Sequence, residues 1–349
     1  MAGIHDEPDG SGGTGTVKRI PPAVALLLLA PVLGELVSGH QAPLQFFNPI
    51  LFTALALPYG CGALLCRDLT RRWHKGWLGF LFLSVAYALY EEGVVSRALF
   101  DPQWREAGVL AQYDHVAGVN WTYGIMLMHF HVAISMLSSV MLAELLYPER
   151  RHQPWLSNGQ AALCGLVLAL WAPVLALLAR ADEPLYVPSA VLWALTGLAI
   201  VGLVLAAWLL PAQPLRPVPR SAPRSRPFLI LGALNMTAVF GTVFFLPEVG
   251  VRSPLILSVA FLLALDGVTL WLLLSWSGHG FAWDDRHRLA LVAGLLAFFL
   301  VFGVLSDLER FQGKSLVSLG VVLALLRLRR RVTERIGNRA PQAVAESPG

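Results

Sequence analysis

The feature that most constrains this chain is a series of apolar runs that recurs along nearly its whole length. A helix rises ~1.5 Å per residue and the hydrocarbon core of a bilayer is ~30 Å thick, so ~20 apolar residues cross it. Only 14% of the residues are charged, against ~25% in soluble proteins. We therefore predict an all-α fold, a polytopic transmembrane helical bundle of about ten spans. The predicted spans are 20–38, 49–66, 77–99, 121–147, 159–179, 188–210, 228–246, 254–277, 289–306 and 315–328.

Basic residues gather in alternate loops between these spans. If both termini lie inside the cell, 20 of the 26 Lys and Arg residues fall in inside segments and six fall outside. The positive-inside rule requires this asymmetry, and an odd number of spans would destroy it. The sequence therefore predicts a multi-pass protein of the cell membrane with the N-in/C-in orientation. Because the charge of +4 reflects topology, membrane lipids are expected partners and nucleic acid is not.

The chain divides by composition into five segments. Residues 1–17 are rich in Gly, Ser and Asp and are predicted to be a disordered tail. A six-span half, 18–210, and a four-span half, 228–331, are joined by a Pro/Arg-rich cytoplasmic linker at 211–227. The remainder, 332–349, is predicted to be a second disordered tail.

Two adjacent carboxyl groups, Glu91 and Glu92, lie in the outer half of the third predicted span. Ionisable residues inside a span are costly and mark functional sites by default. Two neighbouring carboxyls in an apolar helix resist being ionised together, so at least one is expected to be protonated. The fourth span enters from the same side and places His129 and His131 at nearly the same depth.

Helical spacing separates the two histidines. His131 shares a face with small and polar residues, including Gly124, Ser135 and Ser138, and such faces pack against helices or line cavities. His129 projects roughly opposite His131. One interpretation is a centre that activates water, with Glu as general base and His as acid or stabiliser. The other is a structural Glu–His hydrogen bond between packed helices.

A divalent metal held by the two glutamates and His131 is a further possibility, but two or three ligands are too few to indicate zinc. No metal or other cofactor is therefore predicted. Secondary polar candidates are Glu35 (with His40 nearby), Asn235 and Asp266. Glu144 lies close to a predicted span end, where we expect it to be hydrated.

The segment Tyr90-Glu91-Glu92-Gly93-Val94-Val95-Ser96-Arg97 resembles the first motif of the CAAX-protease and bacteriocin-processing (CPBP) intramembrane proteases. The resemblance implies that Glu91 or Glu92 activates water and that Arg97 is its structural partner. It also implies that His131, or else His129, is the histidine of the second motif. The stretch 31–148 as a whole resembles uncharacterised bacterial multi-span proteins, which implies a membrane location alone.

Three functions remain open. The first is an intramembrane hydrolase, peptidase-like, that acts on a membrane-anchored peptide or lipid and has its glutamates and His131 in one cavity. The second is a proton-coupled transporter, with Glu35, the glutamate pair and Asp266 along one path. The third is a non-catalytic subunit or scaffold with mutually satisfied carboxyls. Neither a G-x-x-x-x-G-K-[ST] loop nor a G-x-S-x-G motif occurs. Oligomeric state and substrate are left open.

Overall fold

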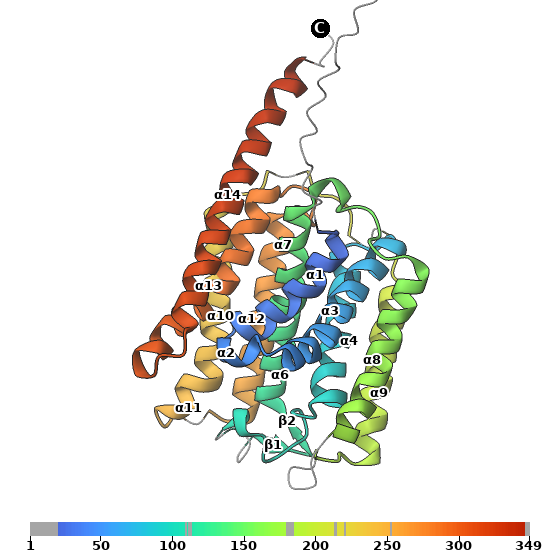
Figure 1. Ribbon diagram of the computed structural model, residues 1–349, viewed down its shortest axis with the longest axis vertical. Helices are drawn as coiled ribbons and strands as arrows, with labels where there is room; N and C mark the ends of the chain where they lie inside the picture. Colours follow the sequence, from blue (N-terminus) through green and yellow to red (C-terminus); the bar gives the residue numbers. More distant parts are fainter. Residues whose placement is uncertain are drawn as a thin grey trace, which may run out of the picture.

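The computed structural model describes residues 20–345, except 109, 111–113, 179–184, 213–214, 220 and 252. The all-α class is confirmed, because helices make up most of the described chain (Figure 1). A single two-residue hairpin, His115–Val116 (β1) with Val119–Asn120 (β2), is the only sheet among the described residues. The predicted disordered tail at 1–17 lies outside these residues.

Eight helices in the described part of the chain are long and apolar enough to cross a membrane. Three of them continue from α-helix into π-helix, the wider helix with i→i+5 hydrogen bonds. The eight are Pro49–Arg72 (α3), Trp77–Leu89 with Tyr90–Val95 (α4, η2), Trp121–Phe130 with His131–Ser138 and Ser139–Leu146 (α6, η4, α7), Asn158–Leu178 (α8), Ala190–Leu209 (α9), Ser225–Phe240 with Gly241–Phe245 (α10, η6), Leu255–Trp276 (α12) and Asp285–Glu309 (α13).

The first and last predicted spans take a different form. Residues 20–38 form a shorter helix, Pro22–Pro31 (α1) with the π-helical Val32–Val37 (η1). Residues 315–328 belong to Lys314–Ala345 (α14), which extends past the bundle at one end (Figure 1). The predicted disordered tail at 332–349 is thus helical as far as Ala345, because Arg, Glu and Ala favour helix. The remaining short helices are Pro43–Phe46 (α2), Arg105–Ala107 (η3), Pro148–Arg150 (η5) and Leu246–Glu248 (α11).

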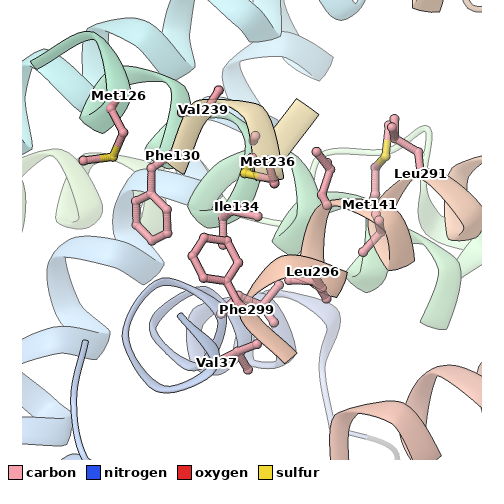
Figure 2. Close-up of a cluster of buried hydrophobic side chains, with 14 of the residues drawn as sticks. Val37, Met126, Phe130, Ile134, Met141, Met236, Val239, Leu291, Leu296 and Phe299 are labelled. Atoms are coloured by element: carbon pink, nitrogen blue, oxygen red, sulfur yellow. The ribbon is translucent and has the colours of Figure 1, made fainter. Parts of the chain in front are cut away.

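The helix α6–η4–α7 runs through the middle of the bundle (Figure 1). On one side it packs with α10 and α13, and Met126, Phe130 and Ile134 meet Met236 and Phe299 there (Figure 2). On the other side it packs with α1, α3 and α4. One apolar core therefore joins the predicted six-span and four-span halves.

Helices α10 and α13 approach closely through two glycines. A Cβ added at Gly232 would lie 2.8 Å from the carbonyl oxygen of Leu291, and one added at Gly294 would strike the carbonyl oxygen of Leu229. Small residues permit such backbone approach between helices in membranes, where packing and not the hydrophobic effect drives association. The contact fixes the position of α13, which carries one wall of the site described below.

A buried network of charges lies at the end of α3. Arg67 is 1% exposed, and its guanidinium lies 3.2 Å from Glu144 and 3.4 Å from Asp68. Arg71 contacts Glu144 at 2.7 Å and Arg72 contacts Asp68 at 3.2 Å. The expectation that Glu144 is hydrated is wrong, because it is 1% exposed. A buried charge is tolerated only when it is paired, and these three arginines and two carboxylates pair one another.

The same network holds the loop that precedes α8. Asp68 accepts hydrogen bonds from the backbone N–H groups of Trp155, at 2.7 Å, and Leu156, at 3.2 Å. The Arg67 guanidinium stacks 3.4 Å above the Trp155 ring and donates to the carbonyl oxygen of Arg151 at 2.9 Å. The network thereby anchors α3, α7 and this loop at one end of the bundle and leaves the other end for the site.

Candidate functional site

Four π-helical segments in the described chain converge on one cavity. They are η1, η2, η4 and η6, and each contributes residues to its lining, among them Glu35, Glu92, His131 and Phe244. A π-helical turn inserts one extra residue into a helix, turns the side chains around it, and occurs frequently at functional sites. In this bundle the insertions turn polar side chains of three apolar helices inward.

The centre of the cavity is a pair formed by Glu92 and His131. The Nε2 atom of His131 lies 2.6 Å from Oε1 of Glu92, and His131 is 1% exposed. The second carboxylate oxygen of Glu92 accepts a hydrogen bond of 2.8 Å from the Ser96 hydroxyl, four residues further along the chain. Both side chains are buried, and the two atoms are within hydrogen-bond distance of each other. The structure thus brings together two residues that the sequence predicts at equal depth.

Glu91 lines the same cavity on the neighbouring turn. Its Oε2 atom accepts a hydrogen bond of 3.3 Å from the Tyr87 hydroxyl, and Oε1 accepts none from the described residues. The Tyr87 ring also packs against the His131 ring, with centroids 6.1 Å apart. Glu91 is therefore the carboxylate of the pair with an oxygen left to bind water or substrate.

A third carboxyl group reaches the cavity from the first helix. Glu35 accepts a hydrogen bond of 2.7 Å from the Tyr59 hydroxyl, and the Tyr59 ring lies 5.8 Å from the His131 ring, between centroids. Beyond Glu35, His40 lies 3.8 Å from its carboxylate and 3.4 Å from that of Glu106. His40 and Glu106 are 41% and 46% exposed, so they form a polar mouth that opens outward from the buried residues.

The cavity has a volume of ≈ 610 Å³, within the ~300–1,000 Å³ range of small-molecule sites. Its polar wall carries the carboxyl, imidazole and phenol groups already described. Its opposite wall is aromatic and comes from α10, η6 and α13. The phenylalanines of that wall are Phe240, Phe244, Phe245, Phe298, Phe299 and Phe302.

Three sequence candidates lie outside the cavity lining. His129 faces away from His131, as predicted, and its Nδ1 lies 2.5 Å from the Asp266 carboxylate on α12. The Asn235 amide donates to the Thr269 hydroxyl at 3.0 Å. These contacts join α6 and α10 to α12, so they pack helices against one another and do not form part of the glutamate–histidine centre.

Arg97 makes no contact with Glu91 or Glu92 in the structure. Its guanidinium donates to the carbonyl oxygen of Tyr186 at 2.8 Å and lies 5.6 Å from the Trp193 ring. Arg97 also has φ of +65°, which turns the chain away after η2. The role implied by the resemblance, a partner of the glutamates, is therefore not the one it has here.

The described residues contain no group of three His, Cys, Asp or Glu side chains arranged to hold a metal ion. The proposed ligand set of Glu91, Glu92 and His131 thus lacks metal-binding geometry. Helical spacing places Tyr87 on the face of Glu91, at i, i+4. Sequence reasoning did not find Tyr59 or the phenylalanine wall, because the aromatic wall depends on which helices pack together.

The fold and site define a helical membrane protein with a buried carboxylate–imidazole pair in a half-polar, half-aromatic cavity. The chain belongs to an uncharacterized membrane protein family, whose model matches residues 24–327. No curated protein and no solved structure matches the chain. The description of the matched family does not name the CPBP proteases.

Proposed function

We propose that this protein is an intramembrane hydrolase that acts on a membrane-embedded substrate. The observation that carries the proposal is the Glu92–His131 contact of 2.6 Å beside Glu91, in a cavity of ≈ 610 Å³. A structural hydrogen bond between packed helices needs no cavity, and a scaffold needs no carboxylate with an unengaged oxygen. The resemblance of residues 90–97 to the CPBP motif, which implies that Glu91 or Glu92 activates water, favours the same reaction class.

The chemistry assigns a separate task to each residue. Glu91 takes a proton from a water molecule, and the water oxygen forms a bond to the carbonyl carbon of the substrate. The bond between that carbon and the leaving atom then breaks, and the leaving atom takes the proton shared by Glu92 and His131. The proton on Glu91 returns to that pair. Water is consumed, and the products are a carboxylic acid and a protonated leaving group.

The orientation proposed from the sequence places this chemistry near the outer face. In the N-in/C-in arrangement of ten spans, α1–η1 and α14 add two spans to the eight helices described above. The basic network of Arg67, Arg71 and Arg72 then lies at the cytoplasmic end, as the positive-inside rule requires. His40 and Glu106 then face the opposite side, so water reaches the cavity from outside the cell.

The transporter alternative predicts that Asp266 lies in one path with Glu35 and the glutamate pair. Asp266 instead binds His129 and is absent from the cavity lining. The hydrolase proposal therefore accounts for more of the arrangement of the described residues than the transporter proposal does.

Hydrolysis is tested with ¹⁸O-labelled water, because the label enters the acid product whichever substrate is cleaved. The purified protein is placed in liposomes containing membrane lipids and a quenched-fluorescent membrane-anchored peptide, and products are read by mass spectrometry. We expect ¹⁸O in a carboxylic acid product, lost in Glu91→Gln and Glu92→Gln and retained in Asp266→Asn. Label incorporation equal to that of protein-free liposomes would refute the proposal for these substrates, and equal incorporation by all four proteins would refute the assigned residues.

A further inference from the structure

The lining of the cavity includes partly exposed residues at two places. On the polar side it ends at His40 and Glu106, which are half-exposed. On the aromatic side it ends at Phe245 and Phe302, which are 51% and 39% exposed although they lie on membrane-crossing helices. Exposed phenylalanines on such helices face lipid tails. The cavity therefore connects an aqueous mouth with a lateral opening toward the bilayer between η6 and α13.

The two openings require an occupant with two chemically different ends. The aromatic wall runs from buried Phe299, which is 3% exposed, outward to Phe302, and it offers no hydrogen-bonding side chain. A hydrocarbon chain has no hydrogen-bonding groups and leaves none unpaired against this wall. A peptide backbone would leave N–H and C=O groups unpaired, at a cost of several kcal/mol each. The wall thus fits an alkyl chain and disfavours an extended polypeptide.

The ionisable residues at the polar end of the cavity restrict the head group of a lipid that binds there. Four carboxyl groups line it, and they are accompanied by two imidazoles, those of His40 and His131. No Lys or Arg is among the described lining residues, and Lys314 lies beside Gly39 at the rim. An anionic head group would find no ammonium or guanidinium partner among these lining residues, and an unpaired charge is costly in a medium of low dielectric constant. An uncharged head group needs no such partner, and a cationic head group can pair with the carboxyl groups.

We propose that the substrate of this cavity is an acyl lipid with an uncharged or cationic head group. The chain enters between Phe245 and Phe302 and lies along the phenylalanine wall. The acyl carbonyl then reaches Glu91 and the Glu92–His131 pair. This inference rests on the proposed function for the fate of the substrate: the acyl C–O bond of an ester breaks, the water oxygen joins the acyl carbon, and the released alcohol takes the proton.

The binding step is tested with two photoreactive lipids that share a diazirine-bearing palmitoyl chain. One is a monoacylglycerol and the other is the free fatty acid, ionised at pH 8 in phosphatidylcholine liposomes. We expect the monoacylglycerol to label peptides that contain Phe245 and Phe302, and the fatty acid to label them about tenfold less because the cavity lining offers its carboxylate no Lys or Arg partner. Equal labelling by both lipids, or labelling spread evenly over the lipid-facing α8 and α9, would overturn the inference.

Variants at the lateral opening supply the control. Phe245→Gln and Phe302→Gln remove apolar contact at half-exposed positions, so folding is preserved and labelling should fall by about tenfold. Phe281→Gln, at a position that is 54% exposed and outside the cavity lining, should leave it unchanged. Displacement of the label by an unlipidated transmembrane peptide would contradict the choice of a lipid.

Binding and turnover are read separately. Labelling is measured in Glu91→Gln as well as in the wild type, since it needs no reaction, and ¹⁸O-palmitate release from the monoacylglycerol reports hydrolysis. Labelling by the lipid with hydrolysis of neither the lipid nor the peptide would overturn the proposed function and leave the occupant standing. Hydrolysis of the peptide without labelling by the lipid would overturn the occupant and leave the function standing.

Discussion

Replacement of Asp68 by Ala should destabilise the protein strongly. Asp68 is fully buried and accepts four hydrogen bonds, two from backbone N–H groups and two from guanidinium groups. Arg67 retains Glu144 and carbonyl oxygens, and Arg72 retains Asn158 and the Leu156 carbonyl oxygen. The two N–H groups have no substitute, and each buried unsatisfied donor costs ~1–3 kcal/mol. We therefore expect a loss of ~2–6 kcal/mol, with the lost ion pairs placing the value in the upper half of that range.

The assay is reversible unfolding in mixed micelles, followed by tryptophan fluorescence, for the wild type and three variants. Asp68→Asn keeps one oxygen for the backbone N–H groups and should fall between the wild type and Asp68→Ala. Glu149→Ala, at an exposed position near the same loop, should change the free energy of unfolding by less than ~0.5 kcal/mol. A cost below ~1 kcal/mol for Asp68→Ala would refute the reasoning that buried N–H groups depend on this carboxylate.

Other predictions concern single positions. Asp284 caps α13 by accepting from the backbone N–H groups of Arg286 and His287, so Asp284→Ala should cost ~0.5–2 kcal/mol in the same unfolding assay. Burial raises the pKa of Asp284, but the charge of His287 and these N–H groups have the larger effect and lower the pKa. The wild type should therefore have a larger free energy of unfolding than Asp284→Asn at neutral pH, and this difference should be lost as the pH falls below ~4. A difference that does not shrink as the pH is lowered from 6 to 2.5 would contradict this sign. Gly294→Ala should cost ~1–3 kcal/mol through overpacking, whereas Gly320→Ala, where a Cβ meets nothing within 4 Å, should be neutral or stabilising; equal melting temperatures for the two variants would refute the close approach of α10 and α13.

Much of the fold follows from the sequence because each span must satisfy its own backbone in lipid. This requirement makes a long apolar run a helix wherever it occurs, and eight such helices are present in the described residues. The runs at 20–38 and 315–328 are less regular for identifiable reasons. The first turns into a π-helix at Val32, and the second passes without a break into an Arg-rich helix.

The candidate site was predictable in part. Depth along two consecutive helices and the helical face of His131 were enough to pair it with the glutamates and to set His129 apart. Arg97 was misplaced because residue spacing alone does not show that the chain turns at positive φ after η2. Tyr59 and the phenylalanine wall come from helices distant in sequence, so their positions depend on packing that no local pattern encodes.

The burial of Glu144 also depends on helix packing that the local sequence does not show. A charged residue near a span end is usually hydrated, and its neighbours in sequence are apolar. Its partners, Arg67 and Arg71, lie more than 70 residues away. A sequence can indicate that a buried charge needs a partner, but the identity of that partner follows from which helices meet.

The central claim is that Glu91 and the Glu92–His131 pair perform chemistry and do not merely hold helices together. The most direct measurement is ¹⁸O turnover and unfolding free energy in the same preparation of the wild type and Glu91→Gln. General base catalysis contributes ~10²–10⁴-fold, so we predict a loss of that size with stability unchanged or slightly increased, because an amide still bonds Tyr87 without a buried charge. Undiminished turnover in Glu91→Gln, or a loss of turnover that only follows unfolding, would contradict the account.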